Sequence, residues 1–144
     1  ASPNPLSLYR EMHRILKPGG TLVIQDGVYL RKPHGKAEEA MNQEYCKGFA
    51  LRSMCTPSEM MGALRRAGFE SIIMIDKTKE IGPSMRDVER RGKLVRSLHF
   101  ILNTLGLVSQ AESDIFLAVL NQKKMYDVGL FGYVALSARK PLRE

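Results

Sequence analysis

The order of hydrophobic and polar residues divides the chain into segments with helical and strand-like periodicity. In residues 4–16 the apolar side chains recur at helical spacing and share one face. Pro18 cannot continue this helix, and the Gly19–Gly20 pair can adopt the positive φ that ends it. Thr21–Gln25 is a short β-branched run typical of a buried strand, and Asp26 follows it. The predicted apolar face of the helix consists of Leu8, Met12, Ile15 and Leu16.

A polar turn and a second helical pattern follow this first strand. Residues 27–55 have the character of a lid or pocket segment, and residues 36–54 predict a helix within it. Thr56 and Glu59 form the two ends of a capping box, which predicts the start of a third helix. An Ile-rich run at residues 71–75 then predicts a second strand. One stripe of the second helix would contain Ala37, Ala40, Met41, Tyr45 and Phe49.

The last part of the chain predicts two helices and a final strand. Residues 85–105 form a long helical pattern, and Ser109 with Glu112 forms a second capping box that opens another helix. Residues 130–140 then predict a third strand. Strands interspersed with helices predict an α/β fold, and we expect a single domain over residues 1–144. One face of the long helix would contain Leu94, Leu98, Ile101, Leu102 and Leu105.

Length and composition are those of a globular protein. The chain has 144 residues, of which 44% are hydrophobic and 26% charged, enough for one domain with a core. No apolar run approaches the roughly 20 residues that span a bilayer, and the first residues do not have the pattern of a signal peptide. The two cysteines, Cys46 and Cys55, match no metal or redox spacing. We therefore expect a cytoplasmic location and no metal site.

The net charge of +7 raises the question of nucleic-acid binding. Most basic residues are dispersed along helices beside acidic ones, which is typical of a solvated surface. The one dense patch lacks interleaved aromatic residues on which bases could stack. Nucleic acid is therefore not an expected partner. The patch consists of Arg86, Arg90, Arg91, Lys93 and Arg96.

Three stretches together resemble one known family. Residues 14–26, RILKPGGTLVIQD, resemble the segment from helix D to strand 5 of class I S-adenosylmethionine (SAM)-dependent methyltransferases, in particular the branch that acts on quinones, sterols and other small molecules. Residues 64–70, LRRAGFE, with the Ile-rich strand after them, resemble the late helix and strand 6 of that family. Residues 132–141, GYVALSARKP, resemble its final antiparallel strand 7.

The resemblance implies an α/β fold, the C-terminal part of a Rossmann-like sheet with strands 5, 6 and antiparallel 7. Two added helical segments, residues 27–55 and 84–128, would cover the acceptor substrate. The implied function is methyl transfer from SAM to a small-molecule acceptor, with this chain as the acceptor-side half. Methyl transfer from SAM mainly requires alignment of the acceptor and exclusion of water, and in some members a general base.

The cofactor-binding half of the family pattern is missing from the sequence. No glycine-rich loop follows a strand, and no acidic residue stands at the end of a second strand, so no SAM-binding residue is assigned. Strand 5 of the family lies between strands 4 and 7, so Thr21–Gln25 would have one unpaired edge that invites another chain. Three interpretations remain open: a fragment of a longer enzyme, a half completed by a partner or second copy, and a non-catalytic module that dimerises.

Candidate site residues follow from the place of the first strand. Ligands of open α/β sheets bind beyond the carboxyl ends of the strands, which places Asp26 near the acceptor. Asp26 and His34 are the candidates for a general base, against the alternatives of a turn-capping carboxylate and a solvated loop histidine. Asp76, at another strand end, is expected to be a surface or structural residue. The candidates for acceptor binding, which could also simply pack the second helix on its neighbours, are Tyr29, Asn42, Tyr45 and Phe49.

Overall fold

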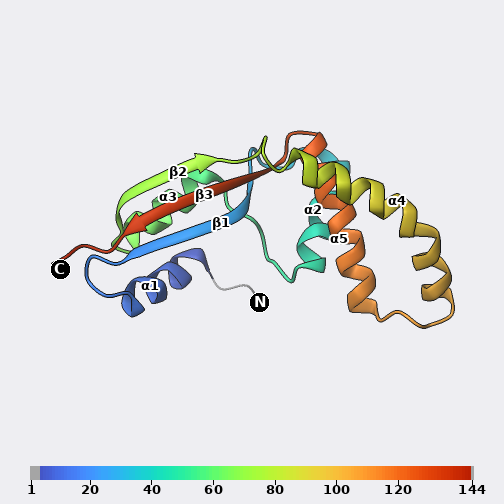
Figure 1. Cartoon of the computed structure of the whole chain (residues 1–144), viewed down its shortest axis with the longest axis horizontal. Helices are drawn as coiled ribbons and strands as arrows, with labels where there is room; N and C mark the ends of the chain where they lie inside the picture. The colour runs from blue at the N-terminus through green and yellow to red at the C-terminus, as the bar shows by residue number, and fades with distance from the viewer. Residues whose placement is uncertain (1–3, 144) are drawn as a thin grey trace.

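Residues 4–143 of the chain are described by a computed structural model, shown in Figure 1. Asn4 caps the first helix by accepting a hydrogen bond from the Leu6 amide, and both predicted capping boxes, at Thr56 and Ser109, are present. The elements are α1 (Pro5–Ile15), β1 (Thr21–Tyr29), α2 (Gly35–Gly48), α3 (Pro57–Arg66), β2 (Glu70–Asp76), α4 (Gly82–Thr104), α5 (Gln110–Asp127) and β3 (Phe131–Arg139).

The last strand of the chain lies between the other two. Within the described residues the strand order is β1-β3-β2, and β3 pairs antiparallel with both neighbours. β1 and β2 therefore run parallel to each other, with their carboxyl ends toward the helices α2, α4 and α5 (Figure 1). This arrangement confirms the predicted sheet, in which the strand resembling strand 5 lies beside an antiparallel strand 7.

One face of the sheet is covered by α1 and α3. Side chains at alternate positions of the three strands point to this face and form a continuous core with the two helices. Lys140 fixes the end of α1 to the end of β3, since its ammonium donates to the backbone carbonyls of His13 and Leu16 at 2.8 and 3.0 Å. The buried residues of this core are Tyr9, Val28, Met60, Ala63, Leu64, Ala67, Phe69, Val134, Leu136 and Ala138.

The opposite face of the sheet is apolar and exposed. The pairing register places Val23 and Ile73 on either side of Ser137, and Ile75 beside Ala135 in the next row. Val23, Ile73 and Ile75 are 66%, 61% and 52% exposed. Exposed apolar patches of this kind mark surfaces that bind something else. We call the surface of Val23, Ile73 and Ile75 the open sheet face.

The outer edge of β1 is also open over most of its length. No strand of the described residues pairs with it, because β1 is the terminal strand of the sheet beside β3. At its carboxyl end the Tyr29 amide donates a hydrogen bond to the Cys55 carbonyl at 3.0 Å. The unpaired edge predicted for Thr21–Gln25 is therefore present in the structure.

Helices α2, α4 and α5 form a helical lobe beyond the carboxyl ends of β1 and β2 (Figure 1). A second core, which includes Tyr29 of β1 and Phe131 of β3, joins this lobe to the sheet. In residues 4–143 no helix is both long and apolar enough to cross a membrane. The other buried members of the second core are Tyr45, Cys46, Met54, Met125 and Leu130.

The predicted apolar face of α1 is partly wrong. Leu8 and Ile15 are 40% and 66% exposed, whereas Tyr9 is buried. Leu6, Tyr9, Met12 and Leu16 pack on the sheet instead. Two apolar stripes overlap on this helix, and periodicity alone does not say which of them meets the sheet.

The first strand is longer and the second helix shorter than the sequence predicted. β1 continues to Tyr29 because β3 pairs with it as far as Phe131. α2 ends at Gly48 because Ala50 takes a positive φ of 53°, and the Leu51 amide closes the last turn on the Cys46 carbonyl at 2.8 Å. Glycine is the usual residue where a helix ends with a positive φ, so an alanine at this position does not indicate the helix end in the sequence.

The predicted stripes of α2 and α4 are largely exposed. Ala37 and Ala40 face solvent, and Phe49 lies beyond the end of α2. Leu94, Leu98, Ile101 and Leu105 are 53–83% exposed, so the described residues leave this face of α4 uncovered. The packed side of α4 instead contains Met85 and Gly92.

Candidate functional site

The carboxyl end of β1 brings several predicted residues close together. Asp26 lies opposite Val134 of β3, and Asp76 lies opposite the same residue from the other side. The two carboxylates are therefore in one row of the sheet, separated by two strand spacings of about 4.8 Å each. Asp76 accepts a hydrogen bond from the Thr78 amide at 2.8 Å, and bonding to Thr78 lowers the pKa of its carboxyl. It therefore stabilises the turn after β2, as expected of a structural carboxylate.

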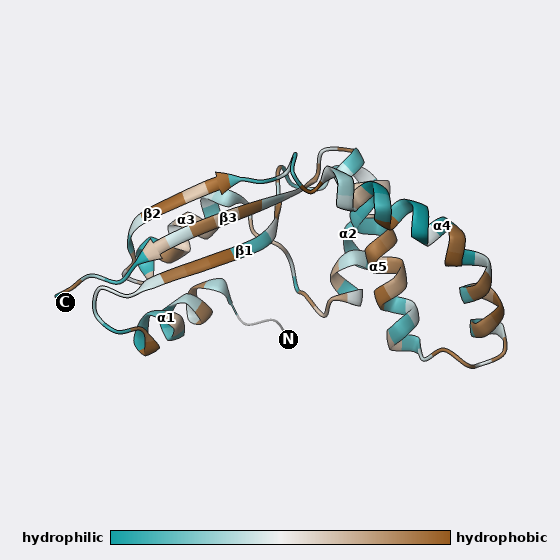
Figure 2. Cartoon of the chain, in the orientation of Figure 1, coloured by the Kyte–Doolittle hydropathy of each residue, from teal (hydrophilic) through white to brown (hydrophobic). Residues whose placement is uncertain are grey.

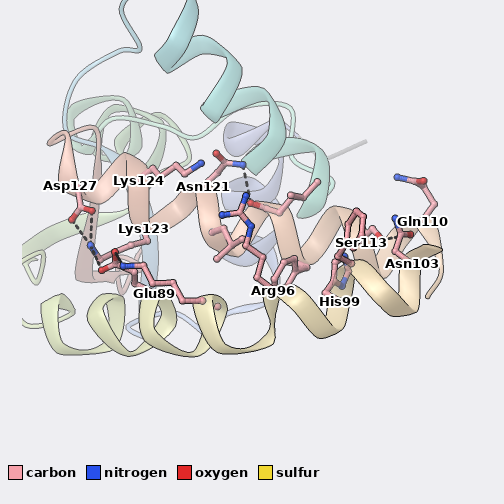
Figure 3. A pocket seen from close by; sticks show the side chains of 16 residues that line it. Glu89, Arg96, His99, Asn103, Gln110, Ser113, Asn121, Lys123, Lys124 and Asp127 are labelled. Atoms are coloured by element: carbon pink, nitrogen blue, oxygen red, sulfur yellow. Dashed lines mark hydrogen bonds and ion pairs between the residues drawn. The ribbon is translucent and has the colours of Figure 1, made fainter. Parts of the chain in front are cut away.

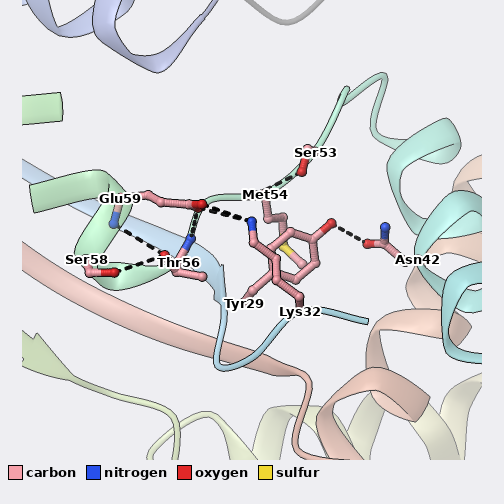
Figure 4. Close-up of polar contacts among 8 residues, drawn as sticks. All are labelled: Tyr29, Lys32, Asn42, Ser53, Met54, Thr56, Ser58 and Glu59. Atoms are coloured by element: carbon pink, nitrogen blue, oxygen red, sulfur yellow. Dashed lines mark hydrogen bonds and ion pairs between the residues drawn. The ribbon is translucent and has the colours of Figure 1, made fainter. Parts of the chain in front are cut away.

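Tyr29 joins the end of the sheet to the helical lobe (Figure 4). Its side chain is 2% exposed, and its hydroxyl donates to Asn42 Oδ1 of α2 at 2.7 Å. The Cys46 thiol lies 3.7 Å from the same oxygen. The side-chain amide nitrogen of Asn42 makes no hydrogen bond within the described residues, so its donor hydrogens remain available to a ligand.

Tyr45 lies beside Tyr29 on the inner side of α2. Its ring contacts Phe131 at 5.7 Å and Phe49 at 5.0 Å between centroids, and burial raises the pKa of its hydroxyl. Burial likewise raises the pKa of Tyr9 to about 12. Both phenols therefore stay protonated and can act as hydrogen-bond donors at neutral pH.

Asp26 lies among these groups. Its negative charge contributes to the raised pKa values of Tyr9, Tyr45 and Cys55, in each case after burial. One carboxylate oxygen accepts from the Gly27 amide at 2.8 Å. Although the residue is open to solvent on one side, burial of its carboxyl raises its own pKa. A carboxylate beside two neutral phenols can hold a polar hydrogen of a bound molecule.

Two ion pairs attach the segment after β1 to its surroundings. Lys32 lies 3.1 Å from a Glu59 oxygen and 5.1 Å from the centre of the Tyr29 ring, over the face of that ring (Figure 4). Arg31 binds Glu38 through both guanidinium nitrogens at 2.7 Å and also donates to the Val128 carbonyl at 3.0 Å. The second contact ties the start of α2 to the end of α5.

The Arg31–Glu38 pair predicts a pH dependence of stability. The hydrogen bond from Arg31, and then one from the His34 amide, lower the pKa of Glu38 to about 2 from 4.5. Because the folded pKa is depressed, this contribution is complete above about pH 4.5 and is lost as the pH falls toward 2. We expect Glu38→Gln to flatten the fall in unfolding free energy across this window. Glu39→Gln, at an exposed neighbouring carboxylate, is the control, and equal slopes for both variants would contradict the assignment.

The structure separates the remaining candidates from Asp26. His34 is exposed at the N-cap of α2, and its backbone amide donates to a Glu38 carboxylate oxygen at 2.8 Å. Phe49 is 41% exposed, and its ring contacts that of Tyr45. Tyr29 is hydrogen-bonded to Asn42 and shares a core with Tyr45, and the charge of Asp26 acts on Tyr45 from the same end of β1. We call these four residues the sheet-end cluster.

A second concave site lies between α4 and α5 and has a volume of about 510 Å³ (Figure 3). The helices approach closely at Gly92, where a Cβ atom would collide with Leu120. His99 stacks on Phe116 at 4.3 Å, and Arg96 extends from α4 toward Asn121 of α5. The leucine stripe of the long helix does not indicate these lining residues, because those on α4 lie on another face of that helix. Gly92 was the available signal for the close approach.

The segments that follow β1 and β2 in the described residues are polar connections. β1 is followed by a segment with Arg31, Lys32 and Pro33, and β2 by residues 77–81, so neither strand leads through a glycine-rich turn into a helix. The described residues also contain no group of three His, Cys, Asp or Glu side chains arranged to hold a metal ion.

Known proteins match the chain over almost all of its length. No protein-family model matches it. Methyltransferase GfsG from Streptomyces halstedii is 27% identical over 143 residues, which are 96% of this chain and 46% of that protein. Phosphoethanolamine N-methyltransferase 2 from Haemonchus contortus, solved with SAM, matches with a TM-score of 0.66 at 17% identity, over 97% of this chain and 30% of that one.

The chain resembles the C-terminal half of a class I SAM-dependent methyltransferase. It spans less than half the length of the relatives it matches. The chain also matches the [4+2]-cyclase SpnF, with a TM-score of 0.62 at 25% identity, over 96% of this chain and 44% of SpnF. Likeness over this stretch alone therefore does not decide which reaction is catalysed.

Proposed function

We propose that the chain is the acceptor-side half of a SAM-dependent methyltransferase that acts on a small molecule. A second half would bind SAM and complete the sheet. The observation that carries this proposal is the order β1-β3-β2 with an open outer edge on β1. That edge lies where the family's strand 4 pairs, so a further parallel strand can extend the sheet there.

The open sheet face supports the same proposal. An antiparallel sheet with one face in water normally carries polar side chains on that face, whereas here the face that α1 and α3 leave uncovered is apolar. Val23, Ile73 and Ile75 form the kind of apolar surface on which helices of the missing half would pack. Burying such side chains stabilises an interface by about 25 cal/mol for each Å² of apolar surface removed from water.

The sheet-end cluster would hold the acceptor in this proposal. Asn42 and the protonated Tyr45 can donate hydrogen bonds, while Asp26 accepts one from a hydroxyl or amine of the acceptor and can take its proton. The helical lobe would exclude water from the reacting atoms. The free cysteines Cys46 and Cys55 accord with a reducing compartment such as the cytoplasm.

Titration with SAM tests the proposal. We expect no heat of binding when SAM is added to this chain alone, and binding when the chain is combined with a SAM-binding half, whether as any sequence that precedes it in its natural gene or as a partner that co-purifies with it. Tyrosine fluorescence can follow the titration of this chain alone, because its 144 residues include no tryptophan. Absence of SAM binding in every combination would rule out a SAM-dependent enzyme.

A non-catalytic module that dimerises is the second candidate, and the open edge of β1 favours it too. Two copies could pair through this edge, because unpaired strand edges template association. Sedimentation over a range of concentrations distinguishes the candidates. A monomer at all concentrations excludes this dimer, whereas a stable dimer that never binds SAM favours it over the enzyme.

The Asp26→Asn variant tests whether the Asp26 carboxylate acts on the acceptor or only caps the turn after β1. The raised pKa of Asp26 means that the folded state disfavours the ionised form, so the neutral amide is expected to raise the free energy of unfolding slightly at neutral pH. The amide oxygen can still accept from Gly27. If Asp26 acts on the acceptor, kcat/KM of the completed enzyme falls at least about tenfold. Unchanged activity together with lower stability would show a purely structural role.

A further inference from the structure

The end of the α4–α5 hairpin combines two properties that fit a lipid bilayer. Between Ser97 and Ala111 the sequence contains no Asp, Glu, Lys or Arg. The side chains of Phe100, Leu105 and Leu107 in this stretch are 70%, 65% and 69% exposed. Figure 2 shows that this apolar region lies at the end of the helical lobe farthest from the sheet. We call residues 97–108 the hairpin tip.

The apolar side chains of the tip are not confined to one side of α4. Leu98, Ile101 and Leu105 share one face, and they are 55%, 53% and 65% exposed. At about 100° per residue, Phe100 projects more than 90° away from these three. A protein partner docked on one face would leave the other exposed, whereas a bilayer surrounds an inserted tip on all sides.

Basic residues lie directly behind the tip. Residues 86–96 contain five arginines or lysines and two acidic residues. Arg90 and Arg91 pair with Asp87, and Lys93 pairs with Glu89. Arg96 makes no ion pair within the described residues. Basic residues next to exposed apolar ones bind anionic lipid surfaces, because the headgroups attract the cations while the apolar groups enter the acyl region.

Acidic residues limit how deeply the hairpin can enter. Glu112 is held in the capping box of α5, and Asp114 pairs with Lys47. Both lie on the first turns of α5, so the start of that helix stays in the headgroup layer. Insertion is thereby confined to the last turns of α4 and the loop through Val108.

We propose that the hairpin tip docks the protein on anionic membrane surfaces, with residues 98–108 inserted and the basic part of α4 at the headgroups. The attachment is peripheral. It is independent of the proposed methyl transfer, since none of these residues belongs to the sheet-end cluster.

A single tryptophan tests the insertion, because the chain contains none of its own. Phe100→Trp places the probe in the tip, and Ile73→Trp places a matched probe on the open sheet face, where the native residue is 61% exposed. With vesicles of phosphatidylserine and phosphatidylcholine, we expect a blue shift and quenching by brominated lipid for the tip probe only. No shift at the tip, or equal shifts for both probes, would overturn the proposal.

Three further measurements test the occupant of the tip. A blue shift that appears without vesicles as the protein concentration rises would show a second copy of the chain there and refute the bilayer. Leu105→Ser with Leu107→Ser should lower vesicle retention at least tenfold, while Val23→Ser, at a residue of similar exposure, leaves it unchanged. Circular dichroism verifies that all variants fold.

Retention on the vesicles should also weaken several-fold with added salt and with Arg96→Gln. Equal retention on vesicles of phosphatidylcholine alone would contradict a role for the basic residues.

Discussion

Leu64→Ala is expected to lower the free energy of unfolding by about 2–5 kcal/mol, the usual range for a fully buried leucine. Leu64 lies on α3 in the core between that helix and the sheet, and its side chain is 0% exposed. Its removal leaves a cavity between α3 and the sheet, because the paired strands are tied to each other and cannot collapse into it. Urea denaturation followed by circular dichroism measures the change, and the slope with denaturant should not alter.

Leu94→Ala is the matched control for this loss. Leu94 lies on α4 and is 83% exposed, so the same truncation should change the unfolding free energy by no more than about 0.5 kcal/mol. A large effect at Leu94 would mean that its face of α4 is covered in solution. A small effect at Leu64 would mean that α3 does not pack on the sheet as described.

The sequence predicted the fold well wherever a local signal had one structural solution. Both capping boxes start helices at the expected residues. Gly19, in the turn between α1 and β1, has the expected positive φ, 75°. The resemblance supplied the order of the strands, which no periodicity contains. The errors lie where tertiary packing decides. Ile15 fits a helical stripe yet is exposed, since α1 turns Tyr9 to the sheet instead.

The candidate site was predictable in part for the same reason. Ligands of open α/β sheets bind beyond the carboxyl ends of the strands, so Asp26 and Tyr29 could both be predicted to lie at the candidate site. The Tyr29–Asn42 hydrogen bond joins residues that both stood among the predicted candidates. The groove between α4 and α5 was not predictable, because it depends on how two long helices diverge from Gly92. The leucine stripe predicted that this face of α4 is packed, but no part of the described chain covers it.

Gly48→Ala is expected to destabilise the protein by about 1–3 kcal/mol, although alanine is the better helix former. Gly48 ends α2, and an added Cβ would overlap Ala118 Cβ and the Asp114 carbonyl oxygen of α5. Neither is the end of a flexible side chain, and Ala118 is 0% exposed. The two helices must therefore separate to admit one methyl group.

Gly62→Ala should have the opposite sign, because nothing lies within 4 Å of the Cβ that it adds to α3. We expect a gain of about 0.5–1 kcal/mol from the restricted unfolded chain. The pair of substitutions thus separates helix propensity from helix packing. Because α2 also holds Asn42 and Tyr45, Gly48→Ala should alter the near-ultraviolet dichroism of the buried tyrosines, whereas Gly62→Ala should not. If both variants gained stability, α2 would not be held against α5, and the sheet-end cluster would have no fixed wall on the side of the helical lobe.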